Sequence, residues 1–281
     1  MRVKHHKLLK SVWLLITYII LTLFALVYLM PFIRSFIASF MTWAQASSYP
    51  PEWLPSPFTL ENYLKVLRLD LFPRWVFNTA LYAGIIVAGN VFFATMAGYA
   101  FARLRFPGRD ALFSALLALL MVPAFVTLVP SYIIVYKLGL IDNILGLSLL
   151  SLVHVSSIFL MRQYFLSLPQ DVFDAARVDG CGPIKTFFYI GLPLAKPALG
   201  AVAVYQFLGA WNAFLGPLVF LRSPENFTLP VGLSFAFQRA MWTEYTPIIA
   251  GSLIAAAPTI ILFIVLNKYL IRGIVITAGK G

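Results

Sequence analysis

Hydrophobic residues form long runs along this chain, and charged residues fall between them. Six stretches lack Asp, Glu, Lys and Arg over at least about 18 residues, the length of helix that crosses a bilayer. They lie between Lys10 and Arg34, Arg74 and Arg103, Asp110 and Lys137, Asp142 and Arg162, Lys196 and Arg222, and Glu244 and Lys268. None has the alternating pattern of a barrel strand. The sequence predicts an all-α integral membrane protein with six transmembrane helices in a single domain, residues 1–281.

Charge is distributed unequally between the connections of these helices. Only 11% of residues are charged, and with six spans one side receives both termini and most of the 21 Lys and Arg residues. Because Lys and Arg are enriched on the cytoplasmic side of membrane proteins, both termini are expected in the cytoplasm. The net charge of +11 follows from this sidedness and gives no indication of nucleic-acid binding. Residues 34–74 then form an outer loop, in which five prolines prevent a continuous helix and predict a structured cap or short helices.

The connection between the fourth and fifth stretches, residues 167–193, has the pattern of two short helices. Ser167 and Gln170 have the spacing of a capping box, and Gly180 is a natural end for the first helix. A second helix is expected to start at Pro183 and to be closed by Gly191 and Pro193.

The first of these helices has an apolar side that nothing in the short connection covers. This side consists of Val172, Phe173 and Ala176, with Ala175 beside it. An uncovered apolar side with small residues lets another protein approach closely, which predicts a docking element.

The same connection resembles the cytoplasmic signature of ABC importer permeases: Glu-Ala-Ala, three residues, Gly, nine residues, Ile, one residue, Leu-Pro. The spacing is kept, with Asp in place of Glu, at Asp174, Ala175, Ala176, Gly180, Ile190, Leu192 and Pro193. The resemblance implies a type I ABC importer permease fold. It also implies that these residues, with Arg177, form a coupling elbow that seats in the ATP-hydrolysing subunit.

Further stretches are similar to the shorter permease of the carbohydrate-uptake family, the maltose and glycerol-phosphate type. They are Ala100–Gly108, Lys137–Asn143, Arg162–Phe165 and Trp211–Asn212. The resemblance implies import of a sugar or oligosaccharide across the bacterial cytoplasmic membrane, with glycerol phosphate or another small polar solute as the alternative. The implied partners are a second homologous permease, two ATP-binding subunits that hold ATP and Mg, an extracytoplasmic solute-binding protein and membrane lipid.

The fifth stretch combines aromatic rings with side-chain amides, the groups that stack on sugar faces and bond sugar hydroxyls. The candidates for lining a substrate path are Tyr205, Gln206, Trp211, Asn212 and Phe214. The partner permease is the alternative holder of the substrate.

Several other function classes lack their signatures. No carboxylate or ammonium group lies inside any of the six stretches, which argues against an ion-coupled carrier, and His154 alone cannot form an enzyme site. Gly180, Lys185 and Thr186 do not make a P-loop, because the residue directly before the lysine is Ile184 instead of a second glycine and no strand precedes the loop. No catalytic residue, cofactor or metal site is therefore expected in this chain. Ala94, Gly98 and Ala102 recur every four residues and predict close helix packing.

Overall fold

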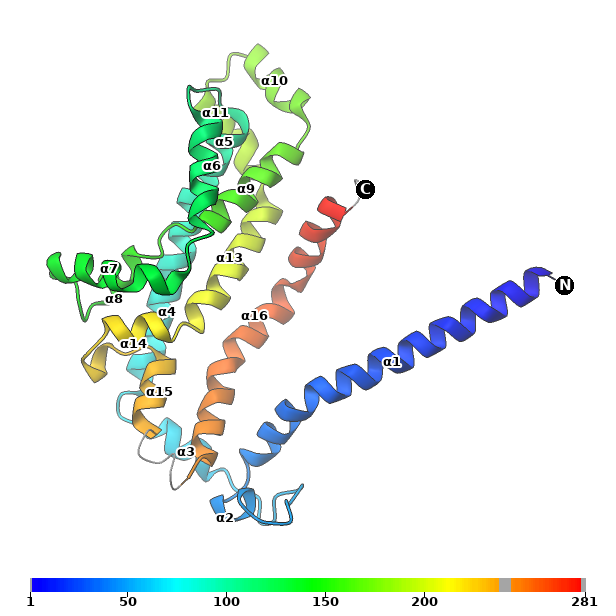
Figure 1. Cartoon of the computed structure of the whole chain (residues 1–281), viewed down its shortest axis with the longest axis vertical. Helices are drawn as coiled ribbons and strands as arrows, with labels where there is room; N and C mark the ends of the chain where they lie inside the picture. The colour runs from blue at the N-terminus through cyan, green and yellow to red at the C-terminus, as the bar shows by residue number, and fades with distance from the viewer. Residues whose placement is uncertain (1, 238–243, 279–281) are drawn as a thin grey trace. The chain divides into compact units, whose positions relative to one another are not determined.

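The computed structural model describes residues 2–237 and 244–278, and side-chain burial within residues 13–237 and 244–265. All regular structure in the described residues is helical (Figure 1). The chain divides into two compact units, residues 1–69 with 236–254 and residues 70–235 with 255–281.

The first unit contains α1 (Arg2–Ala38), α2 (Trp43–Ala46), α3 (Glu61–Leu67) and the start of α16 (Thr246–Ala278). The apolar side chains of α1 from Trp13 to Phe36 are largely exposed, and this surface suits lipid rather than water. The loop after α1 contains the short helices α2 and α3, the second of the two alternatives that its prolines predict. Its compact part forms because the Asn62 amide donates to the carbonyl oxygens of Ser39 and Met41, at 2.9 and 2.8 Å.

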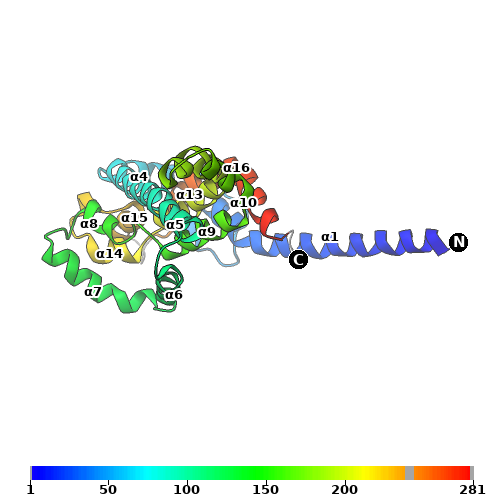
Figure 2. The same ribbon diagram turned by 90° about the horizontal axis from the view of Figure 1, so that it is seen from above.

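The second unit is centred on one long helical segment, made of α4 (Phe72–Gly89), a π-helical turn (Asn90–Ala94) and α5 (Thr95–Arg103). Against it pack α9 (Val155–Ser167) and α13 (Lys196–Trp211), and both views show α13 beside α4 (Figure 1 and Figure 2). A Cβ on Gly98 would lie 2.5 Å from the Cβ of Met161 on α9. The close packing predicted from the small-residue repeat is therefore confirmed at Gly98.

The expected number of six spans is not confirmed. Three helical segments are long and apolar enough to cross a membrane: Trp13–Ala38, Phe72–Arg103 and Thr246–Val265. Two further candidates are bent pairs, α6 (Arg109–Leu119) with α7 (Ala124–Lys137) at 99°, and Pro183–Leu194 with α13 at 74°. In the described residues this gives three spans, or five if each bent pair counts as one.

The fourth apolar stretch departs most from a straight span. It forms α8 (Ile144–Leu149) and α9, separated by the non-helical residues 150–154. A charge-free composition indicates that a segment prefers lipid to water, but it does not require a continuous helix. Where the helix is interrupted, a polar side chain from another helix can form hydrogen bonds with the unpaired backbone N–H and C=O groups. Asn90 supplies such a side chain, as described below.

The other elements of the second unit are α10 (Gln170–Val178), α11 (Pro183–Thr186), a π-helical turn (Phe187–Gly191), α12 (Leu192–Leu194), α14 (Leu215–Phe220), a 3₁₀ turn (Pro224–Asn226) and α15 (Leu229–Phe237) as far as Phe235. The loop around the 3₁₀ turn is fastened to α4. Trp75 Nε1 donates to the carbonyl of Pro224 at 2.7 Å, and the Asn78 amide donates to Glu225 and Phe227 at 2.8 and 2.9 Å.

Candidate functional site

The short helix α10 carries the first half of the predicted coupling elbow and ends at Gly180. Gly180 has a left-handed φ of +78°. Its N–H donates to the carbonyl of Arg177 at 3.0 Å, and the N–H of Cys181 donates to the carbonyl of Ala176 at 2.9 Å. This is the Schellman arrangement, in which a residue without a Cβ turns the chain and satisfies the last carbonyls. The glycine of the signature is therefore a backbone requirement.

Two details expected for the elbow are wrong. The N-cap of α10 is Pro169 rather than Ser167, because Ser167 Oγ donates to the carbonyl of Tyr164 and the Gln170 side chain is used by other residues. Gly191 and Pro193 also do not close the second helix. Pro183–Leu194 is helical throughout, because the π-helical turn at Phe187–Gly191 accommodates the chain, and the bend comes at Ala195.

One side of α10 is buried against the membrane helices. Phe173 and Ala176 are 1% and 3% exposed, and Phe173 belongs to a cluster with Tyr99 of α5, Phe165 of α9 and Phe187. The expectation that the apolar side of α10 is uncovered is therefore wrong for these two residues. Their burial fixes α10 to the ends of α5 and α9, and a phenylalanine side chain such as that of Phe173 contributes roughly 1.5–3 kcal/mol when fully buried.

Arg103 fastens the same junction, although the sequence pattern did not mark it as a site residue. It is 8% exposed, and its guanidinium donates to the carbonyls of Phe165 and Leu168, the latter at 2.8 Å, and to Gln170 Oε1. The guanidinium carbon also lies 4.1 Å from the centroid of the Phe173 ring. A buried arginine of this kind holds two helix ends and the elbow together. The available signal was its position as the first charge after an apolar stretch.

The polar residues of α10 form a surface network beside this junction. Arg177 pairs with Asp174 at 2.9 Å, Gln170 donates to the same carboxylate at 3.0 Å, and Arg177 also donates to the carbonyl of Arg103 at 3.4 Å. The pair is half exposed and contributes at most about 1 kcal/mol. Its effect is to orient the face of α10 that points away from the membrane helices.

The opposite side of the elbow is apolar and exposed in the part of the chain that the structure describes. Val172, Ala175 and Val178 are exposed, Val178 to 88%, and Ile184 on α11 is 73% exposed. The two alanines of the signature therefore have different roles, since Ala176 packs inward and Ala175 faces outward. Ile190 and Leu192 pack against the buried cluster, whereas Pro193 is exposed.

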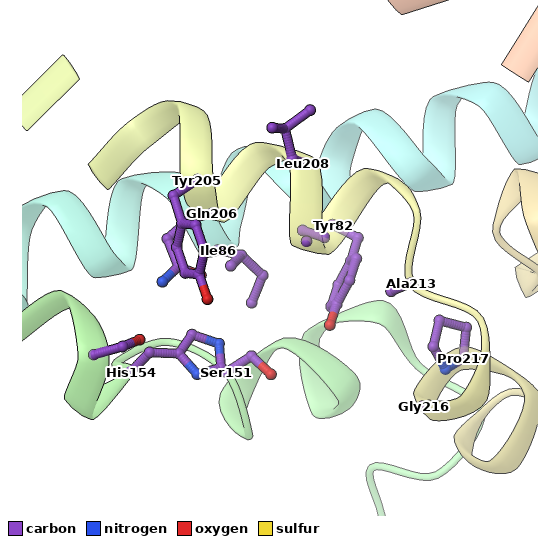
Figure 3. A pocket seen from close by; sticks show the side chains of 13 residues that line it. Tyr82, Ile86, Ser151, His154, Tyr205, Gln206, Leu208, Ala213, Gly216 and Pro217 are labelled. Atoms are coloured by element: carbon purple, nitrogen blue, oxygen red, sulfur yellow. The ribbon is translucent and has the colours of Figure 1, made fainter. Parts of the chain in front are cut away.

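A second feature is a cavity of about 650 Å³ between α4, α9, α13 and α14 (Figure 3). Its walls carry the aromatic rings of Tyr82 and Tyr205 and the polar side chains of Ser151, His154 and Ser156. Gln206, Gly209, Ala213 and Pro217 complete much of the lining. A volume of this size lies within the roughly 300–1,000 Å³ of small-molecule sites.

The non-helical segment between α8 and α9 borders this cavity and is held by Asn90. The buried Asn90 amide donates to the carbonyl of Ser151 at 2.9 Å and accepts from the N–H of His154 at 2.8 Å. A Cβ on the preceding Gly89 would lie 2.8 Å from Leu152, so glycine is needed for this approach. Asn90 thus satisfies the broken backbone and fixes where the Ser151 and His154 side chains project.

Two of the five substrate-path candidates line this cavity. Tyr205 is 57% exposed, and Gln206 is buried and donates to Ser157 Oγ at 2.7 Å. Trp211 lies outside the lining, where Nε1 donates to the carbonyl of Ala255 at 2.9 Å. Asn212 and Phe214 are exposed and also lie outside it. Tyr82, Ser151 and His154 were not candidates, because they come from other stretches that only the fold brings to α13.

A helical chain with several apolar segments long enough to cross a membrane, a short helical elbow and a polar cavity between its helices has the architecture of a transport permease. The family of binding-protein-dependent transport system inner membrane components matches residues 90–275. The chain belongs to this family.

Individual relatives agree with this assignment. The chain is 38% identical over 228 residues to the arabinooligosaccharides transport system permease protein AraQ of Bacillus subtilis (strain 168), a match that covers 81% of each protein. It is 30% identical to the sn-glycerol-3-phosphate transport system permease protein UgpE of Brucella abortus (strain 2308), over 94% of this chain and 96% of UgpE. A crystal structure of a bacterial ABC transporter involved in the import of the acidic polysaccharide alginate contains a chain with a TM-score of 0.80 and 27% identity. That match covers 92% of this chain and 96% of the other.

These matches establish what kind of protein this is. It is a multi-pass membrane subunit of a binding-protein-dependent ABC importer, of the carbohydrate-uptake type, and it acts in transport rather than as an enzyme. A solute-binding protein is a partner of such systems by definition.

Proposed function

We propose that this chain is the permease that carries a sugar or oligosaccharide into a bacterial cell, in a six-span arrangement with both termini in the cytoplasm. The proposal is supported by the 38% identity to a permease named for arabinooligosaccharides. In the proposed importer, this chain pairs with a second homologous permease and with two ATPase subunits. The ATPase subunits bind ATP and Mg, so this chain needs no cofactor of its own.

Coupling to ATP hydrolysis is assigned to residues 167–193, with Asp174, Ala175, Ala176, Arg177 and Gly180 on α10 and Ile190, Leu192 and Pro193 beyond it. The observation that carries this assignment is the two-sided character of α10. Phe173 and Ala176 anchor it to α5 and α9, while Val178 is left 88% exposed. A helix fixed on one side and free on the other passes the movement of a docked subunit to the membrane helices.

The exposed side of α10 provides the test of this assignment. Val178→Glu places a charge on that side without disturbing packing within the chain, and Val178→Thr keeps the size without the charge. In proteoliposomes that contain the complete importer, we expect Val178→Glu to lower transport at least tenfold and Val178→Thr to remain within twofold of wild type. Transport at the wild-type rate by an assembled Val178→Glu importer would remove the coupling role from this face.

Co-purification tests the proposed assembly. The tagged permease, extracted gently from its native membrane, is expected to bring a second permease and an ATPase subunit, identified by mass spectrometry. A lone chain that transports sugar without ATP would contradict the proposal.

Import of glycerol phosphate is the second candidate function. It is favoured by the 30% identity to UgpE over nearly the whole of both chains. The two candidates differ in charge, because glycerol phosphate is an anion and the sugars of an arabinooligosaccharide are not. The charge of the residues that line the cavity can therefore distinguish the two candidate solutes.

A further inference from the structure

The cavity between α4, α9, α13 and α14 combines two aromatic rings with a set of uncharged polar groups. Tyr82 projects from α4 and Tyr205 from α13, and Figure 3 shows both hydroxyls pointing toward the side that carries Ser151 and His154. Each tyrosine offers an apolar ring face and a hydroxyl that donates and accepts hydrogen bonds. These are the groups that fit a sugar, which presents C–H faces and a rim of hydroxyls.

Among the residues that the structure describes, the lining contains no Asp, Glu, Lys or Arg side chain. An anion in such a cavity would lose hydration without gaining a counter-charge, and an unpaired buried charge is strongly unfavourable. An uncharged sugar loses only hydroxyl hydrogen bonds, and the serines, the tyrosines and His154 can replace these. The chemistry of the walls therefore favours a neutral carbohydrate over a phosphate ester or a uronate.

The interrupted helix at the cavity wall is also typical of a substrate-binding site. The break at residues 150–154 lies near the middle of the charge-free stretch from Asp142 to Arg162. Broken helices within apolar stretches are tolerated where they line a cavity, and they recur at substrate sites of transporters. The buried Asn90 holds this break through Ser151 and His154, two residues whose side chains line the cavity.

From these observations we infer that the cavity is a binding subsite for an uncharged sugar unit, so that this subunit itself recognises the solute in transit. Tyr82 and Tyr205 supply the ring faces, and Ser151, His154 and Ser156 bond the hydroxyls. The inference rests on the proposed function, because it concerns the solute that this permease carries. It refines that function by excluding anionic solutes.

Substrate protection of a cysteine measures occupancy of the cavity directly. The chain has one cysteine, Cys181, which Cys181→Ser removes, and Ala213→Cys then places a thiol in the cavity wall. In the assembled importer supplied with its binding protein, uncharged arabino-oligosaccharides should slow maleimide labelling of Ala213→Cys about tenfold. A control thiol at Thr127, which is exposed and outside the cavity, should label at the same rate with and without sugar.

A transport measurement tests the contribution of the aromatic wall. Tyr205→Leu should lower uptake of the same sugars at least tenfold while ATP hydrolysis stimulated by the loaded binding protein stays within twofold of wild type. Tyr28→Leu, which changes a tyrosine that is 74% exposed on α1, should leave both unchanged. Normal uptake by Tyr205→Leu, or labelling of Ala213→Cys that sugar does not slow, would overturn the subsite.

A comparison of neutral and anionic probes separates this inference from the proposed function. The wild-type importer is tested with arabino-oligosaccharides, glycerol 3-phosphate and alginate oligomers. ATP-dependent uptake of the neutral probe alone supports both proposals. Uptake of an anionic probe overturns the neutral-sugar subsite and leaves ATP-driven import intact, and ATP-dependent uptake of none of the three overturns both.

Discussion

Gly180 shows how one residue of the coupling signature acts through the backbone. Its φ of +78° lies in the left-handed region, and a Cβ built there meets no atom within 4 Å. The requirement for glycine is therefore conformational and not steric. A residue with a side chain would fit in space but would strain the turn that ends α10, by about 1–2 kcal/mol.

Replacement of Gly180 should loosen the end of α10. Gly180→Ala is expected to lower the equilibrium ratio of the native to the opened turn by roughly five- to thirtyfold, because of this strain, and to reduce transport per ATP hydrolysed by the reconstituted importer. Gly182→Ala is the control, since Gly182 has a φ of −67° and open space around its Cβ position. Equal transport by the two variants would contradict a conformational role for Gly180.

At the scale of elements, the second unit depends on close approach between helices and on loops fastened by polar side chains. Gly98 lets α5 approach α9, where Met161 and Phe165 are fully buried. Asp142 fastens the loop between α7 and α8 to the loop after α14, because its carboxylate accepts from the N–H groups of Arg222 and Ser223, at 2.8 and 2.9 Å, and from the Ser223 hydroxyl.

Gly98→Ala should separate α5 from α9. Its Cβ would lie 2.5 Å from Met161 Cβ and 2.9 Å from the backbone nitrogen of Arg162, so a helix must shift. Such overpacking costs about 1–3 kcal/mol. Thermal unfolding of the purified protein in detergent should occur several degrees lower than in wild type. Gly84→Ala, where no atom lies within 4 Å of the new Cβ, should not lower it.

The Asp142 contact should depend on pH. Burial raises the pKa of the Asp142 carboxyl, but the hydrogen bonds from Ser223 and from the N–H of Arg222 lower it more, and the net shift is downward. A carboxyl with a lowered folded-state pKa stabilises the fold above its unfolded pKa of about 3.9 and loses this contribution as the pH falls through the folded value. The contact should therefore hold at neutral pH and be lost only as the pH falls through the lowered folded-state pKa of Asp142.

Hydrogen exchange at the Arg222 and Ser223 amides measures this contact. At pH 7, Asp142→Asn should lower their protection factors about three- to tenfold, because a hydrogen bond to a charged acceptor is stronger than one to a neutral acceptor. In the wild-type protein, the protection factors of these two amides should fall toward those of the variant as the pH drops below the folded-state pKa of Asp142. Asp70→Asn, at an exposed position, serves as the control, and an identical loss there would show a general effect of charge.

At the scale of the whole molecule, the decisive property is the orientation of the chain in the membrane. The proposed arrangement places the elbow, with Cys181, in the cytoplasm and residues 34–74 outside. In this arrangement the coupling surface and the outer loop lie on opposite sides of the membrane, as an importer that receives solute from outside and energy from inside requires.

Labelling with a membrane-impermeant maleimide tests this orientation. Cys181 should remain unlabelled in intact spheroplasts and react in inverted membrane vesicles. In the Cys181→Ser background, Tyr49→Cys, at a position that is 95% exposed, should show the opposite pattern. Labelling of both thiols from the same side would contradict the six-span arrangement, since an odd number of spans between residues 49 and 181 separates them.

Much of the identity of this protein was determined by the sequence alone. Length and charge-free composition select the bilayer as solvent, because no ionised group is tolerated unpaired in hydrocarbon. The signature from Asp174 to Pro193 identifies the family, because its residue types are set by local requirements. Gly180 is needed for a left-handed turn, and small or apolar residues are needed where helices and subunits meet.

The tertiary structure decided which of these residues act together. The sequence predicted that Phe173 and Ala176 lie on an uncovered side of α10. They are buried, because α5 and α9 lie against α10. Apolar composition predicted a straight fourth span, but Asn90 supplies the hydrogen bonds that allow the helix to break. The cavity joins Tyr82, His154 and Tyr205 from three stretches, and local pattern contains no record of such long-range contacts.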